Sequence, residues 1–227
     1  NLLEERYKSH TETRELFSVS SQHYAFVVNA FVSLLKRADM TRYELFLRET
    51  RTYEIIEDVK NFRSEIGVLF LNGYNRDVLT KMFDDNRLTY TSLFKARPHI
   101  FVSKSNPLAK HKVVSLEDLE DFPYLSYDQG IHNSFYYSEE ILSQIPHKKS
   151  IVVSDRATLF NLLIGLDGYT IATGILNSNL NGDNIVSIPL DVDDEIDIVY
   201  LKHEKATLSK MGEKFLDNLV KEVTFDD

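Results

Sequence analysis

Polar side chains that could bind a ligand recur in this sequence at turns that follow predicted strands. The candidate residues, in chain order, are Ser20, Ser21, Gln22, Arg51, Thr52, Asn72, Gln129, Asn133, Arg156 and Thr173. Hydroxyls, backbone N–H groups and helix N-termini that face one cleft attract anions, and an arginine adds a bidentate contact to a carboxylate. Taken together, these positions predict a site for a small anionic ligand.

Each of these residues also has a purely structural explanation. Serine and threonine are favoured N-cap residues, and for any single position we favour capping over ligand contact. The capping candidates are Ser20, Ser21, Thr52 and Ser154. For Arg51 and Arg156 the structural explanation is a surface salt bridge. The predicted anion site therefore depends on the turns as a group.

Catalytic and metal chemistry find little support in the sequence. Nucleotide-binding, hydrolase and zinc-protease motifs are absent, and the chain has no cysteine, which excludes thiolate catalysis and cysteine metal sites. The seven histidines include no pair at helical ligand spacing, so we expect no metal and no cofactor. We interpret Glu139 and Glu140 as the solvated face of an amphipathic helix. No catalytic residue is nominated.

Length and composition limit the class of protein. The 227 residues allow one large or two small domains, and 43% hydrophobic with 27% charged residues is typical of folded globular proteins. A net charge of −9 opposes binding to a phosphate backbone. No apolar run approaches the roughly 20 residues of a membrane helix. The chain starts without methionine and without a secretion signal, so we expect a cytoplasmic protein and a fragment of a longer one.

Strands and helices alternate along the chain, which predicts mostly parallel α/β sheets covered on both faces. Expected strands are 16–19, 43–47, 66–71, 88–94, 100–103, 124–127, 150–153, 169–173, 185–188 and 196–201. Expected helices are 27–35, 55–59, 78–82, 115–118, 134–145, 156–166 and 208–223. In the helix 134–145 we expect at least one residue of the aromatic run 135–137 to be core. The pattern restarts after Pro107, which predicts two lobes with a cleft between them.

Several ordered segments resemble one family. The most specific are Phe101-Val102-Ser103-Lys104, Asn106-Pro107-Leu108-Ala109 and Val114-Ser115-Leu116-Glu117-Asp118-Leu119. The chain resembles the effector-binding domain of LysR-type transcriptional regulators. The resemblance implies two Rossmann-like lobes of the type 2 periplasmic-binding-protein fold, joined by two crossover strands around a ligand cleft. It implies residues 16–98 plus 198–227 as the first lobe and 99–197 as the second.

The resemblance also implies partners. Residues 1–15 would be the remnant of a linker helix, with an N-terminal winged helix-turn-helix, absent from this fragment, binding DNA. A small effector would bind in the cleft of a homodimer or homotetramer. Ser20, Ser21 and Gln22 match the main effector turn, Asn72 the end of the third strand, and Gln129, Arg156 and Thr173 the second lobe.

A narrower similarity concerns Ser20-Ser21-Gln22-His23-Tyr24 and the stretches 133–140 and 155–160. These segments are similar to a Gram-positive subgroup that controls methionine and cysteine metabolism or uptake, which would imply a sulphur amino acid or its activated precursor as effector. Two alternatives remain: an extracytoplasmic solute-binding protein for a small anion, marked by a secretion signal, and an enzyme on the same fold, marked by a poised base.

Overall fold

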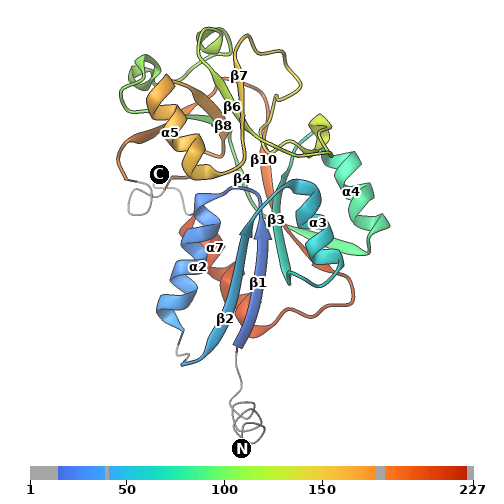
Figure 1. Cartoon of the computed structure of the whole chain (residues 1–227). Coiled ribbons are helices and arrows are strands. Elements are labelled where there is room, and N and C mark those ends of the chain that lie inside the picture. The colour runs from blue at the N-terminus through green and yellow to red at the C-terminus, as the bar shows by residue number, and fades with distance from the viewer. Residues whose placement is uncertain (1–14, 39–40, 177–181, 224–227) are drawn as a thin grey trace, which may run out of the picture.

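The protein folds into two lobes, each built on a five-stranded sheet (Figure 1). The computed structural model describes residues 15–38, 41–176 and 182–223. The predicted linker remnant 1–15 lies outside these ranges except for its last residue. We call the lobe that begins with the first strand the first lobe and the other the second lobe.

The first lobe has a mixed sheet with the strand order β2-β1-β3-β10-β4. Its strands are β1 (Glu15–Ser21), β2 (Tyr43–Glu49), β3 (Ile66–Leu71), β4 (Leu88–Ala96) and β10 (Ile196–His203). Its helices are α2 (Ala25–Arg37), α3 (Thr52–Lys60), α4 (Arg76–Asp85) and α7 (Lys210–Glu222). β1 pairs parallel with β2 and β3, whereas β10 pairs antiparallel with β3 and β4.

The second lobe repeats this arrangement with the strand order β7-β6-β8-β5-β9. Its strands are β5 (His99–Ser103), β6 (Tyr124–Tyr127), β7 (Ser150–Val153), β8 (Tyr169–Ala172) and β9 (Ile185–Pro189). Its helical segments are α5 (Arg156–Leu166) and the single turns η1 (Pro107–Lys110), η2 (Glu117–Leu119) and η3 (Phe135–Tyr137). The chain passes into this lobe between β4 and β5 and returns between β9 and β10.

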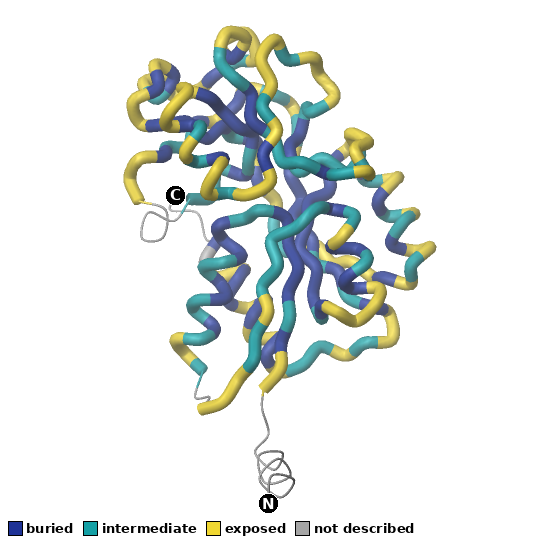
Figure 2. Tube along the Cα trace, viewed as in Figure 1, coloured by how far each residue is buried: buried dark blue, intermediate teal, exposed yellow. Residues whose placement is uncertain are grey.

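β3 shows why the first lobe forms a three-layer structure. Every residue of this strand is buried, and successive side chains point to opposite faces. Ile66, Val68 and Phe70 pack in the cluster that contains the buried residues of α2 and α7, whereas Leu69 and Leu71 pack in the cluster of α3 and α4. An unbroken apolar run is what a strand covered on both faces requires. Figure 2 shows the buried central strands between partly exposed helices.

Two sequence-based expectations about the fold are wrong. The sheets are mixed, with two parallel and two antiparallel strand pairings in each, because the strand that enters each lobe from the other runs against its neighbours. Residues 134–145 do not form a helix, but only the turn η3 followed by bends. Leu142 has φ 60°, which a right-handed helix does not allow.

The aromatic run at η3 lies at the edge of the core, where the half-buried Tyr137 packs against the core cluster of α3 and α4. None of Phe135, Tyr136 and Tyr137 is buried. Tyr136 stacks on Tyr74 of the first lobe at 4.7 Å between ring centroids, and Tyr137 meets Tyr53 edge to face at 6.1 Å. The aromatic run therefore covers the side of the junction between the lobes.

Candidate functional site

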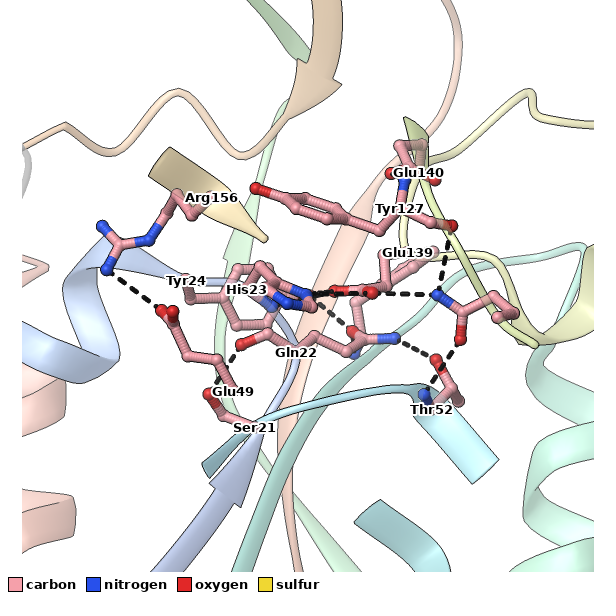
Figure 3. Close-up of polar contacts among 12 residues, drawn as sticks. Ser21, Gln22, His23, Tyr24, Glu49, Thr52, Tyr127, Glu139, Glu140 and Arg156 are labelled. Atoms are coloured by element: carbon pink, nitrogen blue, oxygen red, sulfur yellow. Dashed lines mark hydrogen bonds and ion pairs between the residues drawn. The ribbon is translucent and has the colours of Figure 1, made fainter. Parts of the chain in front are cut away.

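The carboxyl ends of β1 and β3 and the first turns of α2 and α3 face the second lobe (Figures 1 and 3). In parallel sheets this edge is where loops and helix N-termini converge and where ligands bind. From the second lobe, the segment after β6 and the start of α5 face the same space. The residues between the lobes form the candidate site.

An ion pair between His23 and Glu139 crosses the junction. The Glu139 Oε1 accepts a hydrogen bond from the His23 backbone N–H at 2.8 Å and lies 2.9 Å from His23 Nδ1. Both side chains are almost fully buried, at 6% and 3% exposure. The His23 ring also stacks on Tyr127 at 4.0 Å between centroids. His23 of the first lobe is thus in contact with both Glu139 and Tyr127 of the second lobe.

The electrostatics of His23 follow from this environment. Burial lowers its pKa, but the hydrogen bond and the charge of Glu139 outweigh burial, so the pKa of His23 is raised above 6.5. Glu49 raises the pKa of His23 further and Arg156 lowers it. The His23 imidazole, just before the start of α2, therefore binds a proton more readily than a free imidazole does.

A chain of amide hydrogen bonds continues the junction from Gln22 to Gln129. Gln22 Nε2 donates to Thr52 Oγ1 at 2.7 Å, and its Oε1 accepts from the Phe70 backbone N–H at 3.0 Å. The Thr52 backbone N–H donates to Gln129 Oε1 at 3.0 Å. Gln129 Nε2 in turn donates to Glu139 Oε2 at 2.9 Å. The starts of α2 and α3 are thereby joined to one segment of the second lobe.

Arg51 and Asp128 form a second ion pair between the lobes. Arg51 Nη2 lies 2.6 Å from Asp128 Oδ2, with both side chains partly exposed. The Gly130 backbone N–H donates to Asp128 Oδ1 at 2.9 Å. That hydrogen bond first, and the Arg51 guanidinium second, lower the pKa of Asp128. Gly130 itself has φ +64°, and a Cβ there would lie 2.6 Å from Arg51 Nη1, so the guanidinium packs against a position that glycine suits.

A third ion pair lies at the start of α5. Arg156 Nη2 lies 3.1 Å from Glu49 Oε1, at the end of β2, with side-chain exposures of 20% and 23%. The negative charge of Glu49 and the positive charge of Arg156 both reach His23. Arg156 therefore lines the cavity and also acts electrostatically on His23.

A small cavity of about 50 Å³ lies behind these contacts. Its wall is mainly apolar and contains His23, Glu139, Glu140, Arg156 and Thr173 among its polar residues. Its aromatic and aliphatic residues include Phe26, Phe70, Phe101, Phe160, Ile171 and Ile196. Sites for small organic ligands are usually about 300–1,000 Å³. In this arrangement of the lobes the cavity has room for a few water molecules.

Glu140 is buried beside Glu139 but faces its own lobe. It is 4% exposed, and its Oε1 accepts from the Tyr127 backbone N–H at 2.8 Å. Burial first, and the neighbouring Glu139 second, raise the pKa of Glu140 well above 4.5. Burial likewise raises the pKa of Tyr127. The interpretation of Glu139 and Glu140 as a solvated helix face is wrong. The segment is not helical, and both carboxylates are buried and accept hydrogen bonds from the backbone of His23 and Tyr127.

The structure places the predicted site residues in different surroundings. Arg156 and Thr173 line the cavity, and Gln22, Thr52 and Gln129 form the amide chain beside it. Arg51 lies at the rim, and Asn133 is exposed in a neighbouring groove of the second lobe.

Three predicted residues make contacts away from the cavity. Ser20 Oγ bonds to Asp58 at 2.6 Å, on the α3 side of β1. Ser21 Oγ donates to the Gln22 carbonyl at 2.6 Å. Asn72 Nδ2 donates to Asp194 at 3.0 Å, in the connection that leads into β10. These side chains support the turns that carry the site.

The capping explanation is wrong for all four residues to which we applied it. The N-cap residues of α2, α3 and α5 are Tyr24, Arg51 and Asp155. Only Asp155 caps with its side chain, accepting from the Thr158 N–H. α2 and α3 therefore begin next to the junction without side-chain caps of their own. Gln129 of the other lobe accepts from the first residue of α3, and Glu139 accepts from His23, just before the N-cap of α2.

Sequence reasoning missed His23, Glu49, Tyr127, Glu139 and Glu140. His23 directly follows the predicted Ser20–Gln22 turn, and that proximity was the available signal. Glu139 gave no signal, because its partner is 116 positions away and its surroundings have helical spacing.

Within residues 15–38, 41–176 and 182–223, no group of three or more His, Asp or Glu side chains is placed to hold a metal ion. Nor does any helix in those ranges have the length and apolar character of a membrane span.

Comparison with known proteins gives the same fold. The effector-binding domain of QuiR in complex with shikimate is 15% identical, with 92% of this chain and 97% of that chain covered and a TM-score of 0.59. The effector-binding domain of a BenM variant is 16% identical, covering 92% and 94%, with a TM-score of 0.61. The reduced OxyR regulatory domain from Pseudomonas aeruginosa is 12% identical, covering 91% and 98%, with a TM-score of 0.64.

A comparison with curated proteins gave no match. The profile of the LysR substrate binding domain matches residues 20–224, which is nearly the whole chain. The two lobes and their mixed sheets are those expected for that domain. The chain therefore belongs to the LysR substrate-binding domain family, the effector-binding domains of LysR-type transcriptional regulators.

Proposed function

We propose that this chain senses a small anionic metabolite between its lobes as part of a cytoplasmic, DNA-binding transcriptional regulator. The observation that carries the proposal is the junction itself. The starts of α2 and α3 lie there together with His23 of the first lobe, Arg156 of the second lobe and an apolar cavity wall. Uncapped helix N-termini and cationic side chains attract a carboxylate, and the apolar wall accepts the rest of a small molecule. The effector-binding domain of QuiR, which has this fold, is in complex with shikimate and gives an analogy.

Within this proposal, the effector is a sulphur amino acid or its activated precursor, and the regulated pathway is methionine or cysteine metabolism or transport. The support is the sequence similarity of 20–24 and 133–140 to that subgroup. Membership of the LysR family disfavours the solute-binding alternative. Regulatory domains of this family are not enzymes, and we nominate no catalytic base.

The effector acts by changing the arrangement of lobes or subunits, and so the placement of DNA-binding domains in a homodimer or homotetramer. This mechanism requires the effector to bind two arrangements with different affinity. Small-angle scattering of the full-length oligomer should therefore change at saturating effector. Identical scattering together with unchanged DNA bending would remove the mechanism.

The ligand is testable on the chain alone with a thermal-shift panel. The panel contains methionine, cysteine, O-acetylserine, other amino acids, sulfate and citrate. A ligand at 100 times its Kd stabilises the folded state by about 2.7 kcal/mol. A selective shift that is lost in Arg156→Ala supports the cleft as the site. A shift unaffected by that substitution, or no shift with any compound, counts against the proposal.

A further inference from the structure

Glu139 lies where the junction offers its best donors to a negative charge. Its two carboxylate oxygens receive the His23 backbone N–H, the His23 ring and the Gln129 amide, at 2.8, 2.9 and 2.9 Å. Figure 3 shows Glu139 next to the His23 ring. The acceptor comes from the second lobe, whereas the His23 donors come from the first. A carboxylate of the chain itself thus holds the position predicted for an effector anion.

α2 contributes nothing to its own N-terminus. Its first turn has no acidic residue, and the N-cap residue Tyr24 makes no side-chain capping hydrogen bond, as far as the described residues show. The free N–H groups and partial positive charge at a helix start are stabilised by a nearby anion. Glu139 places an anion beside this helix start, because it accepts from the backbone N–H of His23, the residue before the N-cap Tyr24.

The backbone around Glu139 is arranged so that it can reach across. Glu140 is fixed to its own lobe by the Tyr127 N–H at 2.8 Å. The backbone after it leaves helical geometry, with Leu142 at φ 60°. Of two adjacent carboxylates, one therefore anchors the segment and the other crosses the junction. The carboxylate that crosses is hydrogen-bonded by the His23 backbone N–H, the His23 ring and the Gln129 amide, which compensates its burial.

The cavity size shows that Glu139 and an effector cannot share the junction in this arrangement. A volume of about 50 Å³ is well below the roughly 300 Å³ at which ligand sites begin. The effector must therefore displace groups that now fill the space. Glu139 is the group whose charge and position match those of an incoming carboxylate.

We propose that Glu139 is an internal competitor of the effector: its carboxylate holds the two lobes together at His23, and a carboxylate-bearing effector binds by replacing it there. This inference rests on the proposed function, since it describes how the same cleft is regulated. A tethered group has an effective concentration in the millimolar range. The affinity of the domain for an effector is reduced by that internal competition.

Removal of the Glu139 carboxylate tests the proposal, with acetate as the probe. Because the chain has no cysteine, spin labels can be attached at Lys60→Cys on α3 and Asn161→Cys on α5, two exposed positions in different lobes. The distance between the labels reports lobe closure. In Glu139→Ala we expect a longer, broader distance distribution. Millimolar acetate should restore the original distribution saturably, while sodium chloride at equal ionic strength should not.

Matched variants separate charge from folding. Glu139→Gln keeps an acceptor for the His23 N–H and loses the charge, so it should open the lobes partly. Glu120→Gln removes an exposed carboxylate that pairs with Lys148 inside the second lobe at 2.8 Å, and it should leave the distance unchanged. A cooperative thermal transition checks that each variant is folded, and Glu139→Gln carries the test if Glu139→Ala does not fold.

Two results would overturn the proposal. One is a wild-type distance distribution in the folded Glu139 variant. The other is reclosure by sodium chloride as effective as that by acetate. Neither result depends on the effector, so a domain that recloses with acetate but binds nothing in the ligand panel contradicts only the proposed function. If the domain binds a panel compound but the Glu139 variants keep the wild-type distance distribution, only this inference is contradicted.

Discussion

The backbone N–H of Thr52 donates a 3.0 Å hydrogen bond to the side-chain Oε1 of Gln129, 77 positions along the chain. The first turn of a helix in one lobe is thus held by a side chain of the other. The Gln129 amide then passes to Glu139, so one residue couples two helix starts to the second lobe. Through this link, a displacement of Gln129 or Glu139 at the cleft would also disturb the start of α3 in the first lobe.

Replacing Gln129 by leucine should weaken this coupling. The variant leaves the buried Thr52 N–H without its partner and removes one of the donors to the Glu139 carboxylate, which keeps its contacts to His23. An unsatisfied buried polar group costs about 1–3 kcal/mol. The free energy of unfolding in urea should fall by an amount of that order, and the Thr52 amide should exchange its hydrogen faster. Asn133→Ala, at an exposed position, serves as the control. An unchanged Thr52 exchange rate would show that the bond is not maintained in solution.

Gly130→Ala should destabilise the Arg51–Asp128 pair. The residue has φ +64°, and a residue with a Cβ in left-handed backbone geometry costs about 1–2 kcal/mol. The added Cβ also meets the Arg51 guanidinium, so the ion pair must shift. Urea unfolding measures the loss. Gly73→Ala is the matched control, because a Cβ there meets nothing within 4 Å, and its effect should stay within roughly 0.5 kcal/mol. Equal effects of the two substitutions would refute the conformational argument.

His23 should make stability depend on pH near neutrality. Its pKa in the folded state is raised above 6.5, so its stabilising contribution is complete below the unfolded value and is lost as the pH rises through the folded value. The difference in unfolding free energy between wild type and His23→Gln should therefore shrink from pH 6.5 upward. Urea titrations at several pH values measure this difference. A difference that grows with pH would contradict the raised pKa and the pairing with Glu139.

Glu140 should contribute a second dependence on pH, beginning at lower values. Burial raises its folded pKa well above 4.5, so the neutral form is the favourable one and stability is lost as the pH rises above the unfolded value. Glu140→Gln retains an acceptor for the Tyr127 N–H and removes the charge. Its unfolding free energy should vary less with pH than that of wild type above about pH 4.5. A steeper slope in the variant would show that the buried carboxylate is stabilised as an anion.

Elements with strong local patterns were predictable from sequence. β3 was expected at 66–71 and lies at Ile66–Leu71, because its apolar run is continuous, and α5 at Arg156–Leu166 matches its expected range. Polar turns after strands also predicted Gln22, Thr52 and Gln129 as site residues, and the structure places these three residues at the junction between the lobes. These predictions depend on a few adjacent residues.

The missed features depend on contacts between distant residues. The spacing of 134–145 is compatible with a helix, but the segment is irregular, and Glu139 and Glu140 accept hydrogen bonds from the backbone of His23 and Tyr127. Ser20 and Thr52 have the residue types of N-caps, yet tertiary partners take their hydroxyls. Single-sequence patterns carry no information about such partners.

The most direct measurement of the central claim is a two-dimensional amide NMR titration of this chain with a compound from the ligand panel. The account predicts saturable shifts centred on His23, Tyr127, Arg156 and Thr173, in both lobes, with the His23 amide among the most perturbed as its bond to Glu139 is exchanged for the ligand. Saturable shifts confined to surfaces away from these residues would contradict a cleft between the lobes as the effector site.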